Sequence, residues 1–127
     1  MKYLGLLLCL LALSGCKPGE EKAIELAKNE IASDMKDPDS AKFRDLKFIN
    51  SAEKDGVVGG FVCGSVNAKN SYGAYAGFSP FFIALRMAPK GFFSKGVTYT
   101  VDDKKIFSPT SGNDIAFYNT TCGEQKS

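Results

Sequence analysis

The sequence predicts an α+β fold in which one N-terminal amphipathic helix packs on a small antiparallel β-meander. Three observations support this expectation. Apolar residues recur at helical spacing near the N-terminus, and four later segments are rich in β-branched and aromatic residues. Clusters of glycine, asparagine and aspartate separate these segments. One helix followed by several strands is typical of a helix that covers one face of a sheet of three to five strands.

The predicted helix runs from Glu20 to Lys36. Its apolar residues recur at spacings of three and four, which places them on one face: Ile24, Ala27, Ile31 and Met35. Asp37-Pro38 ends the helix, because proline disfavours helical geometry in the residue before it. The apolar stripe is narrow and lacks large aromatic side chains, so a core-packing helix is favoured over one that binds a partner or lies on a membrane.

Two strands joined by a hairpin are expected next. Asp39 or Ser40 could cap a single helical turn before a first strand that ends at Ile49. The polar segment from Ser51 to Gly56 predicts a turn, since Asp-Gly is a strong hairpin signal. A second strand follows from Val57 to about Ala68. Alternation puts Val62, Val66 and Ala68 on one of its faces, and Phe61, Cys63 and Ser65 on the other.

A third strand is expected from Ala76 to Arg86, after a connection at residues 69–75. Pro80 indicates an edge position or a bulge there, because proline cannot donate a ladder hydrogen bond. The segment from Met87 to Gly96 predicts a loop, which contains the apolar pair Phe92-Phe93.

A fourth strand is expected from Val97 to Val101. The charged segment 102–105 predicts a solvated turn, after which Ile106 and Phe107 could pair back. Ser111 and Asp114 have the spacing of a capping box, which predicts a short helix from Gly112 to Cys122. Its residues expected to face the sheet are Ile115, Tyr118 and Cys122.

The N-terminus predicts an export signal. Lys2 precedes an apolar run from Leu4 to Leu13 that is too short to span a bilayer. The next residues, Leu13-Ser14-Gly15-Cys16, resemble the lipobox of bacterial lipoproteins, in which the cysteine is lipidated. The alternative is an ordinary secretory signal with a chance cysteine.

The lipobox resemblance implies a lipid anchor on Cys16, and two or three acyl chains make such an anchor stable. Lys17 follows the cysteine where an aspartate would signal retention in the inner membrane, so the outer membrane, facing the periplasm, is the expected location. The expected division is a signal peptide at 1–15, a tether at 16–19, a single globular domain at 20–123 and a flexible tail at 124–127.

The four cysteines then have separate expected fates. Cys9 leaves with the signal and Cys16 carries lipid, so Cys63 and Cys122 remain to form a disulfide in an oxidising compartment. Zinc ligation by these two thiolates is disfavoured because the chain has no histidine. The full expected fold is therefore α+β, with an N-terminal amphipathic helix on a small antiparallel meander and a disulfide-tethered C-terminal segment.

Composition argues against several functions. Signal cleavage removes one of the 16 basic residues and none of the 14 acidic ones, so the charges nearly balance and no nucleic-acid partner is expected. Without histidine the common general base and nucleophile pairs are missing. Ser65, Ser71 and Lys69 could supply a Ser–Lys dyad but do not match the Ser-x-x-Lys spacing. Paired aspartates at 37 and 39, and at 102 and 103, lack the ligand number of a calcium loop. We therefore expect no enzyme activity, metal or cofactor.

Two segments together resemble small, mostly uncharacterised bacterial and prophage-encoded envelope proteins. Residues 37–44 match the pattern DPxSAxFR, and residues 63–78 match CGxVNAKNxxGxYxGF. Ala74 replaces the usual second glycine before the tyrosine. The resemblance implies a family but no established activity.

The second segment has two interpretations. It could be a structural hairpin whose Tyr75 and Phe78 pack on the N-terminal helix. It could instead be a recognition surface, because tyrosine, asparagine and lysine side chains are common in binding loops. Phe92-Phe93 is a further contact candidate or a satellite core. The candidate partner-binding residues are Asn67, Lys69, Asn70, Tyr72, Tyr75, Phe92 and Phe93.

The leading functional expectation is a non-enzymatic envelope lipoprotein that binds a protein partner. The prophage resemblance implies an exclusion or immunity role. One alternative is an inhibitor of an envelope hydrolase such as lysozyme, because Ser71 to Tyr75 is loosely similar to the Ser-Gly-x-x-Tyr motif of periplasmic lysozyme inhibitors. Another is a purely structural envelope module.

Overall fold

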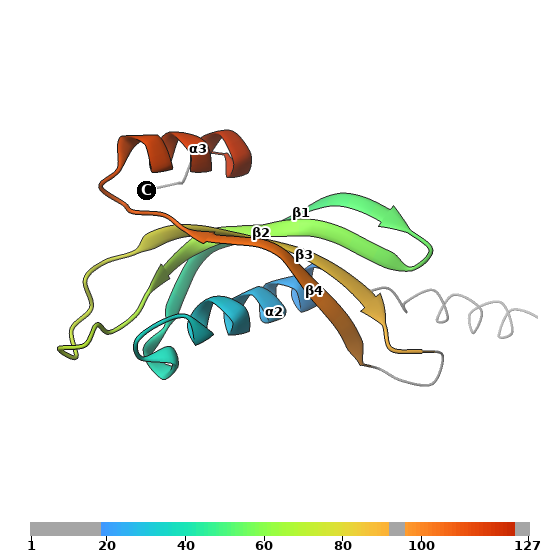
Figure 1. The fold of residues 1–127 in the computed structure, drawn as a ribbon, viewed down its shortest axis with the longest axis horizontal. Helices are drawn as coiled ribbons and strands as arrows, with labels where there is room; N and C mark the ends of the chain where they lie inside the picture. The colour runs from blue at the N-terminus through green and yellow to red at the C-terminus, as the bar shows by residue number, and fades with distance from the viewer. Residues whose placement is uncertain (1–18, 92–95, 124–127) are drawn as a thin grey trace, which may run out of the picture.

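A computed structural model describes residues 19–91 and 96–123 of the chain. Four antiparallel strands form one sheet in the order β1-β2-β3-β4, and a helix lies on each face (Figure 1). The α+β meander predicted from the sequence is confirmed. The lipobox, the Phe92-Phe93 pair and the tail at 124–127 lie outside the described residues. Within those residues, no helix is long and apolar enough to cross a bilayer.

Helix α2 (Glu20–Ser33) covers the lower face of the sheet in Figure 1. Its buried residues are Ala23, Leu26, Ala27 and Ile31, so the apolar stripe faces the core as predicted. The helix ends three residues before the predicted Lys36. The Met35 amide donates to the Ala32 carbonyl, three residues back, and this tightened turn ends the helix ahead of Pro38.

Strands β1 (Lys42–Lys54) and β2 (Val57–Asn67) form a long hairpin. The predicted turn from Ser51 to Gly56 is too long, because residues 52–54 continue the ladder with Lys54 opposite Val57. Asp55 and Gly56 alone form the turn, both with positive φ, as expected of a tight two-residue hairpin loop.

Strand β1 begins earlier than predicted and contains a bulge. Arg44 pairs with Ser65 and Lys47 with Cys63, so Asp45 and Leu46 together lie opposite a single residue of β2. Asp45 takes a left-handed φ of 55° at this point. The extra residue shifts the strand's alternation by one, and both Phe43 and Leu46 consequently pack against the α2 core.

Strand β3 (Ser79–Pro89) lies inside the sheet, and the register shift in its pairing with β4 falls between Ala84 and Leu85, so the predicted edge position or bulge at Pro80 is wrong. The Pro80 carbonyl accepts a bond of 2.7 Å from the Phe107 amide. Both backbone polar groups of one residue in an antiparallel strand point to the same neighbour. The missing N–H therefore faces Phe107, just beyond Ile106, the last residue of β4 that pairs with β3.

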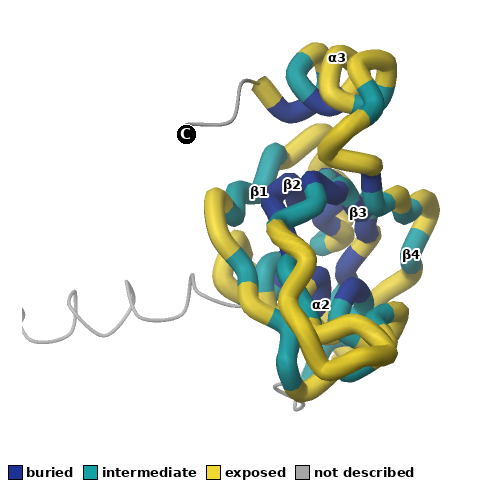
Figure 2. The backbone as a smooth tube through the Cα atoms, turned by 90° about the vertical axis from the view of Figure 1, so that its left-hand side faces the viewer, coloured by how far each residue is buried: buried dark blue, intermediate teal, exposed yellow. Residues whose placement is uncertain are grey.

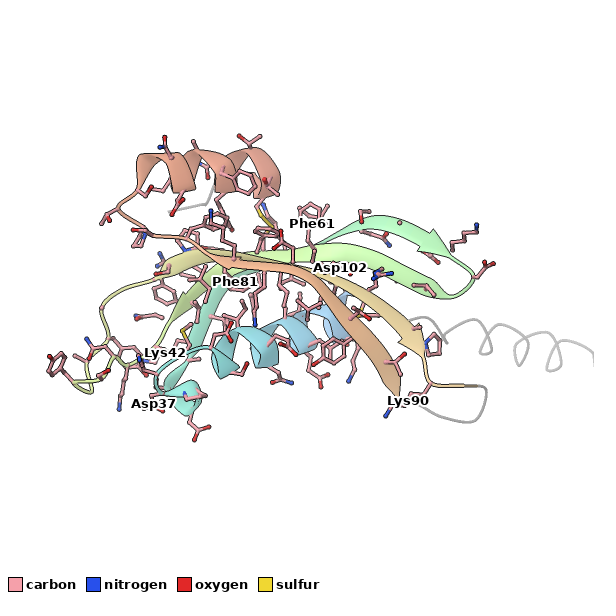
Figure 3. The ribbon with its side chains drawn as sticks, viewed as in Figure 1. Asp37, Lys42, Phe61, Phe81, Lys90 and Asp102 are labelled. Carbon is pink, nitrogen blue, oxygen red and sulfur yellow. A yellow bond between two sulfur atoms is a disulfide. The ribbon has the colours of Figure 1, made fainter. Side chains whose placement is uncertain are left out.

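Strand β4 (Val97–Ile106) includes the charged segment 102–105, which was predicted to be a turn. This prediction is wrong because β4 is an edge strand whose charged side chains reach solvent or a partner. Asp102 pairs with Arg86 at 2.8 Å, and Lys104 pairs with Asp34 at 2.8 Å. Figure 3 shows Asp102 on the sheet.

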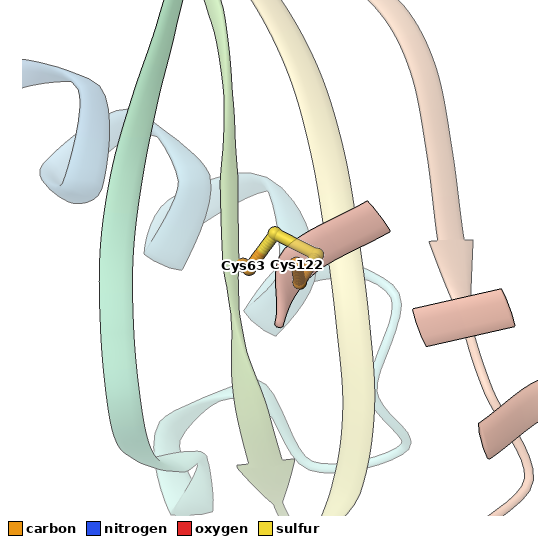
Figure 4. Close-up of a disulfide and its surroundings, with 2 residues drawn as sticks. All are labelled: Cys63 and Cys122. Carbon is orange, nitrogen blue, oxygen red and sulfur yellow. A yellow bond between two sulfur atoms is a disulfide. The ribbon is translucent and has the colours of Figure 1, made fainter. Parts of the chain in front are cut away.

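Helix α3 (Gly112–Cys122) covers part of the upper face of the sheet (Figure 1). The Ser111 hydroxyl accepts from the Asp114 amide, which confirms the predicted cap. A disulfide joins Cys63 of β2 to Cys122 with a Cα–Cα distance of 6.0 Å (Figure 4). Phe107 and Tyr118 complete this second core, whereas Ile115, which was expected to face the sheet, is 37% exposed and lies outside the core.

The two cores follow the alternation of β2. Val58, Val62 and Val66 belong to the α2 side, whereas Cys63 and the packed Phe61 belong to the α3 side. Figure 2 shows buried residues along β2 and β3 in the middle of the sheet, and many exposed residues on α3 and in the loops.

Candidate functional site

The loop that joins β2 to β3, residues 68–78, extends from one end of the sheet (Figure 1). The short 3-10 helix η2 (Pro38–Ser40) lies at the same end. Figure 3 places Asp37 and Lys42, which flank η2, beside this loop. We call residues 68–78 the β2–β3 loop.

Asparagine side chains hold the β2–β3 loop in shape. The Asn70 carboxamide oxygen accepts from the Tyr72 amide at 2.9 Å and from the Ala74 amide at 3.2 Å. The backbone amide of Asn70 donates to the Ala74 carbonyl at 2.8 Å, and the carboxamide oxygen of Asn67 accepts from the Gly77 amide at 3.2 Å. The two asparagines therefore perform the turn chemistry that their positions in the sequence indicate.

Ser40 attaches the β2–β3 loop to η2. Its hydroxyl donates to the Asp37 carbonyl at 2.7 Å and accepts from the Lys69 amide at 2.8 Å. Its carbonyl accepts from the Tyr75 hydroxyl at 2.9 Å. A single residue thus bonds to both arms of the loop, next to the point where Lys69 and Tyr75 form an isolated bridge.

Cations stacked on aromatic rings add to this attachment. The Lys42 ammonium lies 4.6 Å from the centre of the Tyr75 ring, and the Arg44 guanidinium lies 4.0 Å from the centre of the Phe78 ring. The segments 37–44 and 63–78, noted separately in the sequence, therefore form one structural unit.

The candidate residues divide by their contacts. Tyr72 is 95% exposed and has no side-chain contact within the described part of the chain, whereas Tyr75 is 38% exposed and bonded to Ser40. Lys69 and Asn70 are exposed, and Asn67 is half-buried at the end of β2. Tyr75 and Phe78, which were expected to pack on the helix, do not belong to the core that α2 forms. Tyr75 instead contacts Ser40 and Lys42, and Phe78 contacts Arg44.

Sequence reasoning missed Ser40, Lys42 and Arg44 as members of this site. All three belong to the 37–44 segment, and its pairing with the 63–78 segment in one pattern was the signal that could have joined them. Nothing in the described ranges gathers three or more side chains of the metal-ligating types.

No protein-family model, curated protein or solved structure gives a significant match to this chain.

Proposed function

We propose that the chain is a lipid-anchored, non-enzymatic envelope protein that binds a protein partner through the β2–β3 loop. The observation that carries this proposal is Tyr72, which is 95% exposed at the tip of a loop braced by hydrogen bonds at both arms. A tyrosine held on an ordered backbone offers a large contact surface at a low cost in conformational entropy.

The position of the β2–β3 loop relative to the start of α2 supports this proposal. Helix α2 begins at Glu20, four residues after the proposed lipid on Cys16, at the opposite end of the helix from η2 (Figure 1). Its 14 residues span about 21 Å. An anchor at residue 16 would hold the start of α2 near the membrane, and the β2–β3 loop would then point away from it.

An exclusion or immunity role is compatible with this geometry. A small anchored domain that presents one fixed loop toward other envelope proteins can occupy the binding surface of a receptor or an incoming effector. A second candidate, inhibition of an envelope hydrolase, is favoured because the loop projects from one end of the sheet (Figure 1), and a projecting loop can enter an enzyme cleft.

Crosslinking and pull-down of the full chain from its own envelope tests the proposal. Tyr72→Ala is the informative variant, because it removes the exposed ring and no contact that holds the loop. We expect loss of one specific partner with Tyr72→Ala and its retention with Lys54→Ala, an exposed change at the opposite end of the sheet. Equal recovery of all partners by both variants would exclude the loop tip as the binding site.

An inhibition assay with lysozyme separates the two candidates. Inhibition by the full chain that Tyr72→Ala weakens would favour the hydrolase inhibitor. No inhibition, together with a partner lost in the pull-down, would favour the receptor or effector role.

A further inference from the structure

A pocket lies between α3 and the end of the sheet that carries the β2–β3 loop. Its volume is about 370 Å³, within the range of about 300–1,000 Å³ typical of ligand pockets. Phe78 and Pro80 contribute apolar surface from the sheet side, and Ile115 and Tyr118 contribute it from α3. Arg44 and Asn119 bring polar side chains, so the lining is polar and apolar in similar measure.

The Arg44 guanidinium has unused hydrogen-bonding capacity. It lies over the Phe78 ring at 4.0 Å, and a stacked guanidinium keeps its N–H donors in its own plane and available. The nearest acidic group is Asp45, whose carboxylate is 3.7 Å from Nε, beyond hydrogen-bonding distance. Among the described residues, the Arg44 side chain donates no hydrogen bond.

Arg86, the other arginine of the chain, provides a comparison. Its guanidinium donates to both oxygens of Asp102 at 2.8 Å, and this bond raises the Arg86 pKa further above its usual value. The smaller pocket beside it, of about 160 Å³, therefore has a cation that is already neutralised. Among the described residues, the Arg44 guanidinium has only the 3.7 Å ion pair with Asp45, so its charge is less fully compensated than that of Arg86.

We propose that the Arg44 pocket binds an acidic side chain of a partner protein, in a segment where that side chain neighbours an apolar residue. The carboxylate would accept two parallel hydrogen bonds from Arg44, the geometry that guanidinium groups favour. The neighbouring apolar side chain would cover Phe78 and Ile115. Asn119 lies where its carboxamide can bond to the backbone of the segment. That the ligand is a protein segment rests on the proposed function, whereas its charge and polarity rest on the pocket.

Titration of the full chain in detergent with capped dipeptides tests this proposal without any partner. The probe is acetyl-Glu-Phe-amide, and acetyl-Gln-Phe-amide differs from it only in lacking the charge. Binding is followed by the amide chemical shifts of the protein in two-dimensional NMR spectra. We expect the Glu probe to shift residues around Phe78, Ile115 and Asn119, and the Gln probe to bind about tenfold more weakly.

Two variants and one further probe locate the contact. Arg44→Gln should weaken binding of the Glu probe about tenfold, whereas Lys47→Gln, the same charge change on the same strand outside the pocket, should not. If Arg44→Gln perturbs the fold, Asn119→Ala, at a half-buried position of α3 that lines the pocket, replaces it and should also weaken binding. Acetyl-Gln-Phe with a free C-terminal carboxylate tests a chain terminus as the source of the charge.

Equal binding of the Glu and Gln probes, or no shifts at pocket residues at millimolar probe, would overturn the proposal. Tighter binding of the free-acid probe than of the Glu probe would also overturn it, in favour of a chain terminus. Tyr72 does not line this pocket, so failure here leaves the loop-tip proposal to its own experiment. Failure there removes the argument that the ligand is a protein segment, and the charge and polarity of the ligand are still tested by this titration.

Discussion

The Tyr75 hydroxyl donates to the backbone carbonyl of Ser40 across 2.9 Å, although the two residues are 35 positions apart in the chain. This bond and the neighbouring one from the Lys69 amide to the Ser40 hydroxyl close the β2–β3 loop onto η2. The loop backbone is therefore set by contacts within the protein, while Tyr72 at its tip remains free to contact another molecule.

Replacing Tyr75 by phenylalanine should loosen the β2–β3 loop with only a small loss of stability. The variant keeps the ring beneath Lys42 and loses one partly exposed hydrogen bond, which is worth about 0.5–1 kcal/mol. Urea unfolding measures this loss, and hydrogen exchange at the Lys69 and Ala74 amides measures the loosening. Tyr72→Phe is the control and should change neither quantity; equal effects from both variants would show that the Ser40 bond does not hold the loop.

Gly60 and Gly64 should not tolerate a methyl group, although both have ordinary φ values. A Cβ on Gly60 would lie 2.4 Å from the Ile49 carbonyl oxygen, and one on Gly64 would lie 2.6 Å from the Leu46 side chain. Gly60→Ala should therefore destabilise the protein by about 1–3 kcal/mol, the cost of overpacking a core. Thermal unfolding checks this against Gly59→Ala, whose Cβ would meet ordinary contacts of 3.6 Å or more. Similar melting temperatures for the two variants would refute the close approach.

Loss of the disulfide should release α3 more readily than it unfolds the sheet. Cys63 and Cys122 close a loop with a sequence separation of 59, which in the chain-entropy model stabilises by about 4 kcal/mol. Cys63→Ala with Cys122→Ala should lower stability by about that amount and increase hydrogen exchange first in α3. Exchange that rises uniformly across the sheet and α3 would contradict this order.

Stability should fall at high pH partly through Tyr99. Its hydroxyl donates to Glu30 at 2.6 Å, and this bond, followed by desolvation and the negative charge of Glu30, raises the Tyr99 pKa above its ordinary value of 10.0. A raised pKa means that the folded state holds the proton more tightly. The contribution is therefore complete below about pH 10 and is lost as the pH rises through the folded-state value.

Tyr99→Phe isolates this contribution from the lysines that titrate in the same range. The difference in free energy of unfolding between wild type and Tyr99→Phe should stay constant up to about pH 9 and shrink above pH 10. A difference that stays constant through the alkaline range would show that the Glu30 bond does not perturb Tyr99.

The main strands and the two helices were predictable because each leaves a local pattern. Ala27 and Ile31 lie four positions apart on the buried face of α2, as the helical spacing in the sequence indicated. Asp55-Gly56 forms the hairpin turn that its residue types indicated. The errors have nonlocal causes. The bulge at Asp45 breaks the alternation of β1, and charged residues at 102–105 remain in a strand because Arg86 and Asp34 lie within reach.

The candidate site was predictable in part for the same reason. Asn70 and Gly73 are residue types that favour turns, so the position of the β2–β3 loop was predictable from the sequence. The roles of Ser40 and Arg44 depend on a segment far away in the sequence, and no local pattern encodes that contact. The different roles of Tyr72 and Tyr75 were not visible in the sequence, because they depend on exposure and on the hydrogen bond from Tyr75 to Ser40.

Site-specific photocrosslinking in the native envelope tests the central claim most directly. A photoreactive amino acid is placed at position 72 in one full-length variant and at position 54, an exposed site at the opposite end of the sheet, in another. If the β2–β3 loop binds a protein partner, position 72 should give one dominant protein adduct that position 54 does not give. The same adducts from both positions, or none from position 72, would contradict it.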